Sequence, residues 1–361
     1  MYSMYNIPSK PDVQASTLPL PGRRHAILDP SREVPPELRY PAPARRRRHW
    51  VRRVFFSIAI GMILYTLIAV HRLADFGAAI SPQSPFSTQT QWMGGAARIN
   101  MVILSYGGPG HDGPYLTDSL LVISYLPTNG STALLSVPRD LWVQVPPNSG
   151  NYAKLNTAYA YGYEHGGTAV AGTLASGKVS TVLGIAVPYW VSIDFGGFER
   201  LIDAAGGVNV DVPAAFDASY SPNYTPSQHF AAGMTHMDGV LALAYARARY
   251  CIPAVAAGDF ARSARQQQLV MAIANNLRSP ALSFRANAVM DALQPVVASN
   301  LSLADLVLLF TKASLSGARH IELTTQNVLQ DAQSNDGQDI LLPQNDDWST
   351  IITYVQAQLG G

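Results

Sequence analysis

Four arginines lie close together in one stretch of the chain, and their side chains are suited to bind an anion. They fall within nineteen positions: Arg247, Arg249, Arg262 and Arg265. The surrounding chain is short of positive charge, since residues 54–361 carry 14 Lys and Arg against 20 Asp and Glu. A guanidinium group keeps its charge, and its fork of donors matches a pair of phosphate oxygens. This stretch is therefore the first candidate for a functional site.

The second pair of arginines opens a predicted helix that begins near Asp259. One face of this helix, followed at spacings of three and four, carries Arg262, Gln266, Leu269, Ile273 and Leu277. We expect Asp259 to be the N-cap. A helix whose first turns point an arginine and a glutamine inward is suited to line an anion pocket.

The first pair of arginines follows a shorter helical pattern over residues 238–245. Arg247 and Arg249 are two positions apart, and on a helix they would lie on nearly opposite faces. In an extended segment they share a face with Tyr245, so we expect extended geometry in which both guanidinium groups reach one anion. The alternative is a solvated charged loop, in which Asp238 and Asp259 neutralise part of the charge.

A glycine-rich loop over residues 106–118 follows the first strand-like run. Its four glycines allow a ligand to approach the backbone, and Asp112 and Asp118 could both hold a hard cation. The loop matches neither a Walker loop nor the dinucleotide fingerprint. The alternative is an ordinary turn in which Asp118 is a cap.

Arg139 is a further candidate, because it comes directly after an expected hairpin strand in the sequence Pro138-Arg139-Asp140. In α/β proteins, ligands collect at the edge of the sheet where strands end. The alternative is a local surface pair between Arg139 and Asp140, which contributes little energy.

Several other kinds of site are excluded by composition and spacing. The single cysteine, Cys251, allows neither an intramolecular disulfide nor a zinc cluster, and no nucleophile-elbow serine or zinc-spaced histidine pair is visible. The basic excess belongs to residues 1–53, which carry 11 Lys and Arg against 4 Asp and Glu. The folded part therefore lacks the broad positive field of a nucleic-acid-binding surface, and we expect no nucleic-acid partner.

The N-terminal part of the chain predicts a membrane anchor. We expect residues 1–53 to be a disordered basic cytoplasmic tail. The first 44 residues contain nine prolines and few large apolar residues, so they cannot bury enough surface to fold. We expect a transmembrane helix over residues 54–72, built on an uncharged apolar run at 54–70. The preceding arginines orient the tail to the cytoplasm and the folded domain to the outside. A cleaved signal peptide is the alternative, but a tail of this length ahead of one is unusual.

The remainder predicts an α/β fold, with a layered sheet of mixed strands and helices on both faces. Residues 73–97 are expected to be a linker, 98–280 the catalytic domain, and 281–361 a part that completes or covers the same domain. Apolar runs at 99–105 and 120–126 indicate strands, and the latter joins 131–137 as a hairpin through Asn129-Gly130. Residues 213–237 show little periodicity and are expected to be a surface excursion.

These stretches together resemble the LytR-CpsA-Psr family of bacterial cell-envelope glycopolymer transferases over about residues 98–280. The matching stretches are T-D-S-L-L at 117–121, S-V-P-R-D at 136–140, K-L-N-T-A-Y-A-Y-G at 154–162, D-F-G-G-F-E-R-L-I-D-A-A-G-G-V at 194–208, and A-L-A-Y-A-R-A-R-Y with G-D-F-A-R-S-A-R-Q-Q between 242 and 267. Each stretch alone is weak, and their order is highly specific.

The resemblance implies an enzyme that moves a glycopolymer from a polyprenyl-pyrophosphate carrier to a peptidoglycan hydroxyl at the cell membrane, with Mg2+ or Mn2+. Asp118 corresponds to a metal ligand, and Asp259 to a residue with an acid or base role. The pyrophosphate-binding set is Arg139, Arg247, Arg249, Arg262, Arg265 and Gln266. The alternative is a non-catalytic scaffold that binds polyprenyl phosphate.

The chain departs from the family pattern at the end of the first strand. Family members commonly carry Gly-x-Asp there, and this chain has Ser105, Tyr106 and Gly107. Leu116 stands where an arginine often precedes the Asp118 motif. We expect Asp112, in the longer loop, to replace the lost metal ligand.

Overall fold

The computed structural model describes residues 48–83, 97–219, 228–279, 282–313 and 315–360. The expected tail therefore lies outside the described residues up to position 47, as does the 84–96 part of the expected linker.

The first helix, α1 (Arg48–Ile80), is longer than the predicted 54–72 span. The prediction that the linker begins at residue 73 is wrong, because Phe76 and Ile80 are buried apolar side chains that hold the end of this helix on the core. By length and composition, one helix in the described residues could cross a membrane, at Trp50–Ile80.

A six-stranded sheet forms the centre of the fold, in the order β12-β6-β1-β2-β3-β13. The strands are β1 (Ile99–Tyr106), β2 (Thr117–Leu126), β3 (Ser131–Val137), β6 (Tyr189–Asp194), β12 (Val297–Ser299) and β13 (Arg319–Glu322). The pairs β1–β6 and β3–β13 are parallel, and the other three pairs are antiparallel. The predicted mixed sheet and the β2–β3 hairpin are confirmed.

Both faces of the sheet are covered, as the uninterrupted apolar strands predicted. Successive residues of β1 alternate, so that Val102 and Leu104 enter one core cluster and Met101 enters the other. The first cluster lies under α2 (Thr157–Glu164), α3 (Gly167–Leu183) and α9 (Trp348–Leu359). The second lies under the end of α1 and under α6 (Gly258–Leu277), α7 (Leu282–Leu293) and α8 (Leu303–Lys312).

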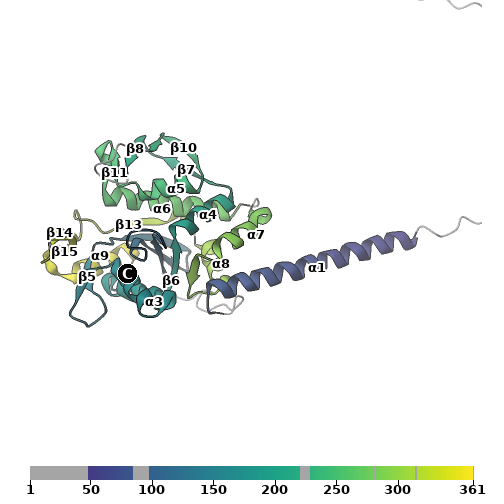
Figure 1. Cartoon of the computed structure of the whole chain (residues 1–361), viewed down its shortest axis with the longest axis horizontal. Helices are drawn as coiled ribbons and strands as arrows, with labels where there is room; N and C mark the ends of the chain where they lie inside the picture. The colour runs from purple at the N-terminus through teal and green to yellow at the C-terminus, as the bar shows by residue number, and fades with distance from the viewer. Residues whose placement is uncertain (1–47, 84–96, 220–227, 280–281, 314, 361) are drawn as a thin grey trace, which may run out of the picture. The chain divides into compact units, whose positions relative to one another are not determined.

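A third core cluster lies beyond the sheet, around α4 (Phe195–Ala205), α5 (Gly239–Arg247) and α6. Figure 1 shows these helices on one side of the central sheet, with short strands beyond them and with α3 and α9 on the other side. The short strands are β7 (Val208–Val212), β8 (Phe216–Ser219), β9 (Gln228–Phe230), β10 (Gly233–Met237) and β11 (Tyr250–Ile252). The prediction of a surface excursion over 213–237 is therefore wrong outside the undescribed residues 220–227, because Phe216 and Phe230 are buried and stack on one another.

The last quarter of the chain extends the sheet at both edges, through β12 and β13. Two further hairpins lie outside the central sheet, formed by β4 (Trp142–Gln144) with β5 (Tyr152–Lys154) and by β14 (Leu329–Gln333) with β15 (Asp339–Pro343). The carboxyl ends of β1, β3 and β6 lie at one edge of the sheet, since β1 and β6 run parallel and antiparallel β2 lies between β1 and β3. That edge holds the candidate site.

Candidate active site

A cavity of about 610 Å³ lies between the central sheet and the layer formed by α4 to α8, and it is polar at one end and mostly apolar along the rest, where Arg278 and Thr311 are the polar exceptions. The polar end is lined by Asp118, Ser119, Arg139, Arg247, Arg249, Arg262 and Gln266. The apolar walls include Leu121 of β2, Ile193 of β6, and Leu269 and Ile273 of α6. The sequence placed Arg262, Gln266, Leu269 and Ile273 on one inward face of the helix, and the structure confirms this.

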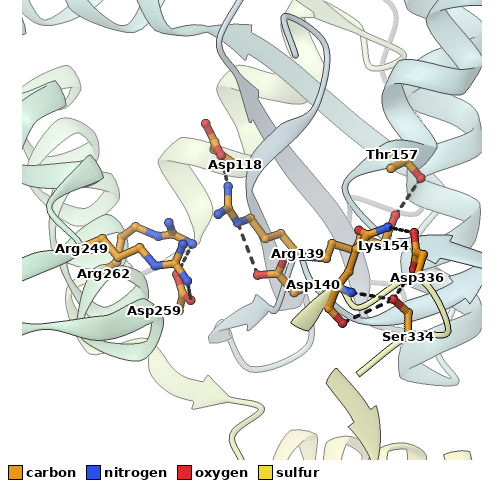
Figure 2. A network of polar contacts seen from close by, with 11 residues as sticks. Asp118, Arg139, Asp140, Lys154, Thr157, Arg249, Asp259, Arg262, Ser334 and Asp336 are labelled. Atoms are coloured by element: carbon orange, nitrogen blue, oxygen red, sulfur yellow. Dashed lines mark hydrogen bonds and ion pairs between the residues drawn. The ribbon is translucent and has the colours of Figure 1, made fainter. Parts of the chain in front are cut away.

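Arg249 and Arg262 are held side by side by one carboxylate, Asp259 (Figure 2). Asp259 Oδ2 lies 3.0 Å from an Arg249 nitrogen, and Oδ1 lies 2.6 Å from an Arg262 nitrogen. The predicted N-cap role of Asp259 is wrong: the N-cap of α6 is Ala257, two residues earlier, and no side chain caps the helix. Asp259 lies in the first turn of the helix, where its carboxylate orients both guanidinium groups.

Arg139 lies opposite this pair, on the sheet side of the site, and Figure 2 shows its guanidinium group between Asp118 and Asp140. It forms a short ion pair with Asp118 and lies 3.6 Å from an Asp140 oxygen. Lys154 Nζ is 3.0 Å from the other Asp140 oxygen. The Arg139 carbonyl accepts a hydrogen bond from the Asn156 backbone nitrogen at 3.0 Å. The side chain is therefore fixed by the ends of two adjacent strands and is not part of a purely local surface pair.

Arg247 and Arg249 both line the cavity, but the backbone that places them differs from the prediction. Helix α5 continues through Arg247, so the expected extended geometry from Tyr245 onward is wrong. The chain leaves the helix at Ala248, which has φ −55° and ψ 114°, and this turn brings Arg249 to the same cavity. The Arg247 guanidinium carbon lies 4.7 Å from the centre of the Phe195 ring, a cation–π contact.

Arg265 does not line the cavity, so its predicted role in binding pyrophosphate is wrong. It is 6% exposed, and its guanidinium group donates hydrogen bonds to the backbone carbonyls of Tyr245, Ala248 and Ala256. It also stacks over the Phe216 ring, 5.1 Å from the centroid. Its donors are used by the protein itself, so Arg265 fixes the turn that carries Arg249.

Gln266 connects the helical layer to the sheet. Its Oε1 accepts a 2.8 Å hydrogen bond from the Ser119 hydroxyl, and its Nε2 donates to the Ala246 carbonyl at 3.3 Å. The side chain lines the polar end of the cavity and keeps α6 in place beside Asp118 on β2.

The polar end of the cavity carries more positive than negative charge. Four guanidinium groups line it together with one carboxylate, Asp118, and a second carboxylate, Asp259, pairs with two of the arginines from outside the lining. The Arg262 side chain is only 11% exposed, and burial lowers its pKa, an effect that nearby Asp259 opposes. Its Nε is buried and makes no hydrogen bond to the protein. A buried donor without a partner costs free energy, so Arg262 is poised to gain from an anionic ligand.

The predicted metal ligands are not brought together. Asp118 lines the cavity, whereas Asp112 is exposed on the loop and does not line it. The loop closes on itself, since Gly108 N donates to the Pro114 carbonyl at 2.8 Å, and this places Asp112 at the tip. Within the described ranges, no group of three His, Cys, Asp or Glu side chains is arranged to hold a metal ion. The prediction that Asp112 replaces the lost metal ligand is therefore wrong.

Most of the apolar wall was not predicted from the sequence. Phe195 and Phe198 of α4, Val297 of β12, and Leu306 and Phe310 of α8 all line the cavity. The sequence of α8 is amphipathic, which indicates a buried face but not what that face covers.

Comparison with known proteins agrees with the resemblance. Residues 84–355 match the model of the LytR_cpsA_psr family. The chain belongs to this family. It is 34% identical over 186 residues to the polyisoprenyl-teichoic acid–peptidoglycan teichoic acid transferase TagV of Bacillus subtilis, covering 50% of this chain and 43% of that protein. It is 32% identical over 186 residues to the corresponding TagU of Bacillus mycoides, covering 52% and 55%. The crystal structure of B. subtilis TagV superposes with a TM-score of 0.55 at 25% identity, over 73% of this chain and 98% of that one. The aligned sequence thus spans about half the length of these curated relatives.

Proposed function

We propose that this protein is a phosphotransferase that moves a glycopolymer from a polyprenyl-pyrophosphate carrier to a hydroxyl of the cell wall and releases polyprenyl phosphate. The observation that carries the proposal is the polarity of the cavity: guanidinium groups from two layers of the fold converge at one end, and an apolar channel continues from them. A pyrophosphate with a long prenyl tail is complementary to this cavity, because its negative charge lies at one end and the rest of the molecule is apolar. The names of TagU and TagV, teichoic acid transferases, support the same substrate class.

The geometry supports transfer by positioning and charge stabilisation. The pyrophosphate lies between Arg139 on the sheet side and Arg249 and Arg262 on the helical side, with the prenyl tail along the apolar wall. An acceptor hydroxyl attacks the sugar-proximal phosphorus, a new phosphorus–oxygen bond forms, and the bond to the bridging oxygen breaks. Polyprenyl phosphate leaves with the charge that the arginines stabilise.

The hydroxyl proton needs only a weak acceptor, because the transition state of phosphoryl transfer is loose. Asp259 is occupied by two arginines, which makes it a positioning residue for them in place of the base suggested by the sequence. Asp118 lines the cavity, whereas Asp259 does not, and we assign to the Asp118 carboxylate the role of accepting the hydroxyl proton.

A divalent cation fits this site only if the substrate supplies most of its ligands. Mg2+ is commonly bound by one or two carboxylates together with substrate phosphates, and Asp118 provides one carboxylate. Mg2+ or Mn2+ held in this way would neutralise charge on the transferring phosphoryl group. The absence of the family's strand-end aspartate at Ser105–Gly107 makes the arginines the larger part of that neutralisation.

The proposal includes attachment to the membrane through α1. Its apolar run at 54–70 follows a cluster of arginines, which orients the tail to the cytoplasm and the folded domain to the outside. The lipid carrier and the peptidoglycan acceptor would then meet on the outer side.

The test is a transfer assay with the full chain in lipid nanodiscs, a lipid-linked glycan as donor, and peptidoglycan as acceptor. We expect glycan on the peptidoglycan and released polyprenyl phosphate in equal amounts. Binding of the donor without either product would favour the alternative, a non-catalytic scaffold. Failure to bind the donor or polyprenyl phosphate at all would refute both functions.

A further inference from the structure

The apolar end of the cavity is formed partly by α1, the helix that the sequence predicts to be the membrane anchor. Phe76 and Ile80, in the last two turns of α1, line the cavity together with Leu306 and Phe310 of α8. Phe76 is 7% exposed and Ile80 is 3% exposed. These two side chains are therefore walls of the channel as well as anchors of the helix on the core.

The cavity follows α6 from its polar end to this apolar end. Arg262 and Gln266 line it at one end of α6, Ile273 and Ala274 further along, and Arg278 just beyond the helix. Sixteen residues separate Arg262 from Arg278, which corresponds to about 24 Å at ~1.5 Å per residue. The cavity is thus an elongated channel, and its volume of about 610 Å³ is within the range of pockets that enclose a small ligand. A long polyprenyl chain does not fit inside whole, so its distal part has to leave the channel.

The end of α1 lies next to the membrane by its own sequence. The helix is 33 residues long, roughly 50 Å, whereas the hydrocarbon core of a bilayer is about 30 Å thick. The uncharged run ends at Val70, and His71, Arg72 and Asp75 follow it. From Val70 to Phe76 is six residues, or about 9 Å along the helix axis. Arg72 also forms a 2.9 Å ion pair with Asp291 of α7, so α1 meets the domain within that short distance.

We infer that the last two turns of α1, through Phe76 and Ile80, are a part of the lipid site that receives the prenyl tail directly from the bilayer and holds it where it leaves the channel. This inference rests on the proposed function and adds to it a tail-binding element outside the arginine cluster. It assigns the anchor helix a role in substrate binding in addition to attachment. The element selects for tail length, because only a tail long enough to pass the channel contacts it.

The test compares two probes with the full chain in nanodiscs: geranyl phosphate, whose tail is short, and undecaprenyl phosphate, whose tail is long. Dissociation constants are measured for the wild type, Phe76→Ala, Ile80→Ala and a matched control, Leu73→Ala. Leu73 is on the same helix, is 38% exposed and does not line the cavity. We expect the two cavity variants to bind undecaprenyl phosphate about tenfold more weakly, the loss expected when a few methylene contacts disappear. Geranyl phosphate binding should stay within about twofold, and the control should match the wild type.

A second measurement does not depend on how the variants fold. An undecaprenyl phosphate analogue with a photoreactive group near the far end of its tail is cross-linked to the wild-type chain, and adducts are mapped by mass spectrometry. We expect adducts at residues 76–80 and in α8. Adducts confined to other parts of the chain, or cavity variants that bind the long probe as the wild type does, would overturn the inference and leave the proposed function intact. If neither probe binds the wild type, the proposed function itself fails.

Discussion

Replacing Arg262 with glutamine should lower the rate of transfer by a large factor while leaving the fold nearly as stable as before. The side chain is 11% exposed, and burial lowers its pKa, so the folded protein already carries a cost for keeping this charge. Asp259 keeps its ion pair with Arg249 at 3.0 Å when Arg262 is lost. Breaking a buried pair is costly when it leaves a charge alone, and here the carboxylate is not left alone. We therefore expect the free energy of unfolding to change by about 1 kcal/mol or less, in either direction.

The effect on transfer should be much larger, because Arg262 is placed to stabilise charge on the transferring phosphoryl group. Removing one such donor commonly lowers kcat by about 10²–10³-fold, or roughly 3–4 kcal/mol. Arg262→Lys should recover only part of this loss, since lysine keeps the charge but cannot offer the planar fork of donors.

Arg265→Gln is the matched control, because Arg265 lies three residues further on the same helix and is also buried. It donates to three backbone carbonyls, and each carbonyl left without a partner costs about 1 kcal/mol or more. We expect a loss of roughly 3 kcal/mol in unfolding free energy. Urea denaturation of both variants and the nanodisc transfer assay measure the two effects. If Arg262→Gln unfolds as readily as Arg265→Gln, or transfers at the wild-type rate, the assignment of Arg262 to the anion site is wrong.

Three other substitutions test separate parts of the site and fold. Phe195→Leu removes the ring under Arg247 and should weaken binding of polyprenyl phosphate about fivefold in a titration, as expected for a cation–π contact of ~1 kcal/mol. Asp118→Asn should raise the Mg2+ concentration needed for half-maximal transfer, and chelation should abolish transfer by the wild type; a wild type indifferent to chelator would remove the cation from the proposal. Glu322→Gln should stabilise the protein at neutral pH, because burial raises the pKa of the Glu322 carboxyl. Below the unfolded pKa of about 4.3, the Glu322 carboxyl is protonated in both the folded and the unfolded wild type, and burial costs no charge. As the pH rises through the raised folded pKa, the buried carboxyl ionises and the wild type loses stability. The Tm advantage of the variant over the wild type should therefore be absent at the acid end and grow from about pH 4 to pH 7.

The central sheet was predictable because its signals are local. Long apolar runs and the Asn129-Gly130 turn specify β1, β2 and β3 without knowledge of the rest of the chain. The short strands β8 and β11 were not predictable. They are four and three residues long, and Tyr250 pairs with Ser219, thirty-one positions earlier. A local sequence pattern cannot indicate pairing between residues so far apart in the chain.

The site was predictable as far as helical periodicity reaches. Arg262 and Gln266 are four residues apart and share the face that Leu269 and Ile273 continue, so one rule placed all four. Arg265 is only three residues from Arg262, and the same rule cannot separate its role. What separates them is the backbone turn at Ala248, whose carbonyl accepts from Arg265, and that turn is a tertiary feature.

The distance between Arg139 and the arginines of the helical layer depends on how α6 packs against the sheet, and two consecutive glutamines of α6 link the two layers directly. Gln266 accepts a 2.8 Å hydrogen bond from Ser119 on β2, one residue after Asp118. Gln267 is fully buried and donates a 2.8 Å hydrogen bond to Ser136 on β3, three residues before Arg139. Adjacent positions of one helix are thus tied to adjacent strands, each close to a charged residue of the sheet side. A pyrophosphate bound between the layers meets arginines whose spacing is set before it arrives, so binding need not reorganise them.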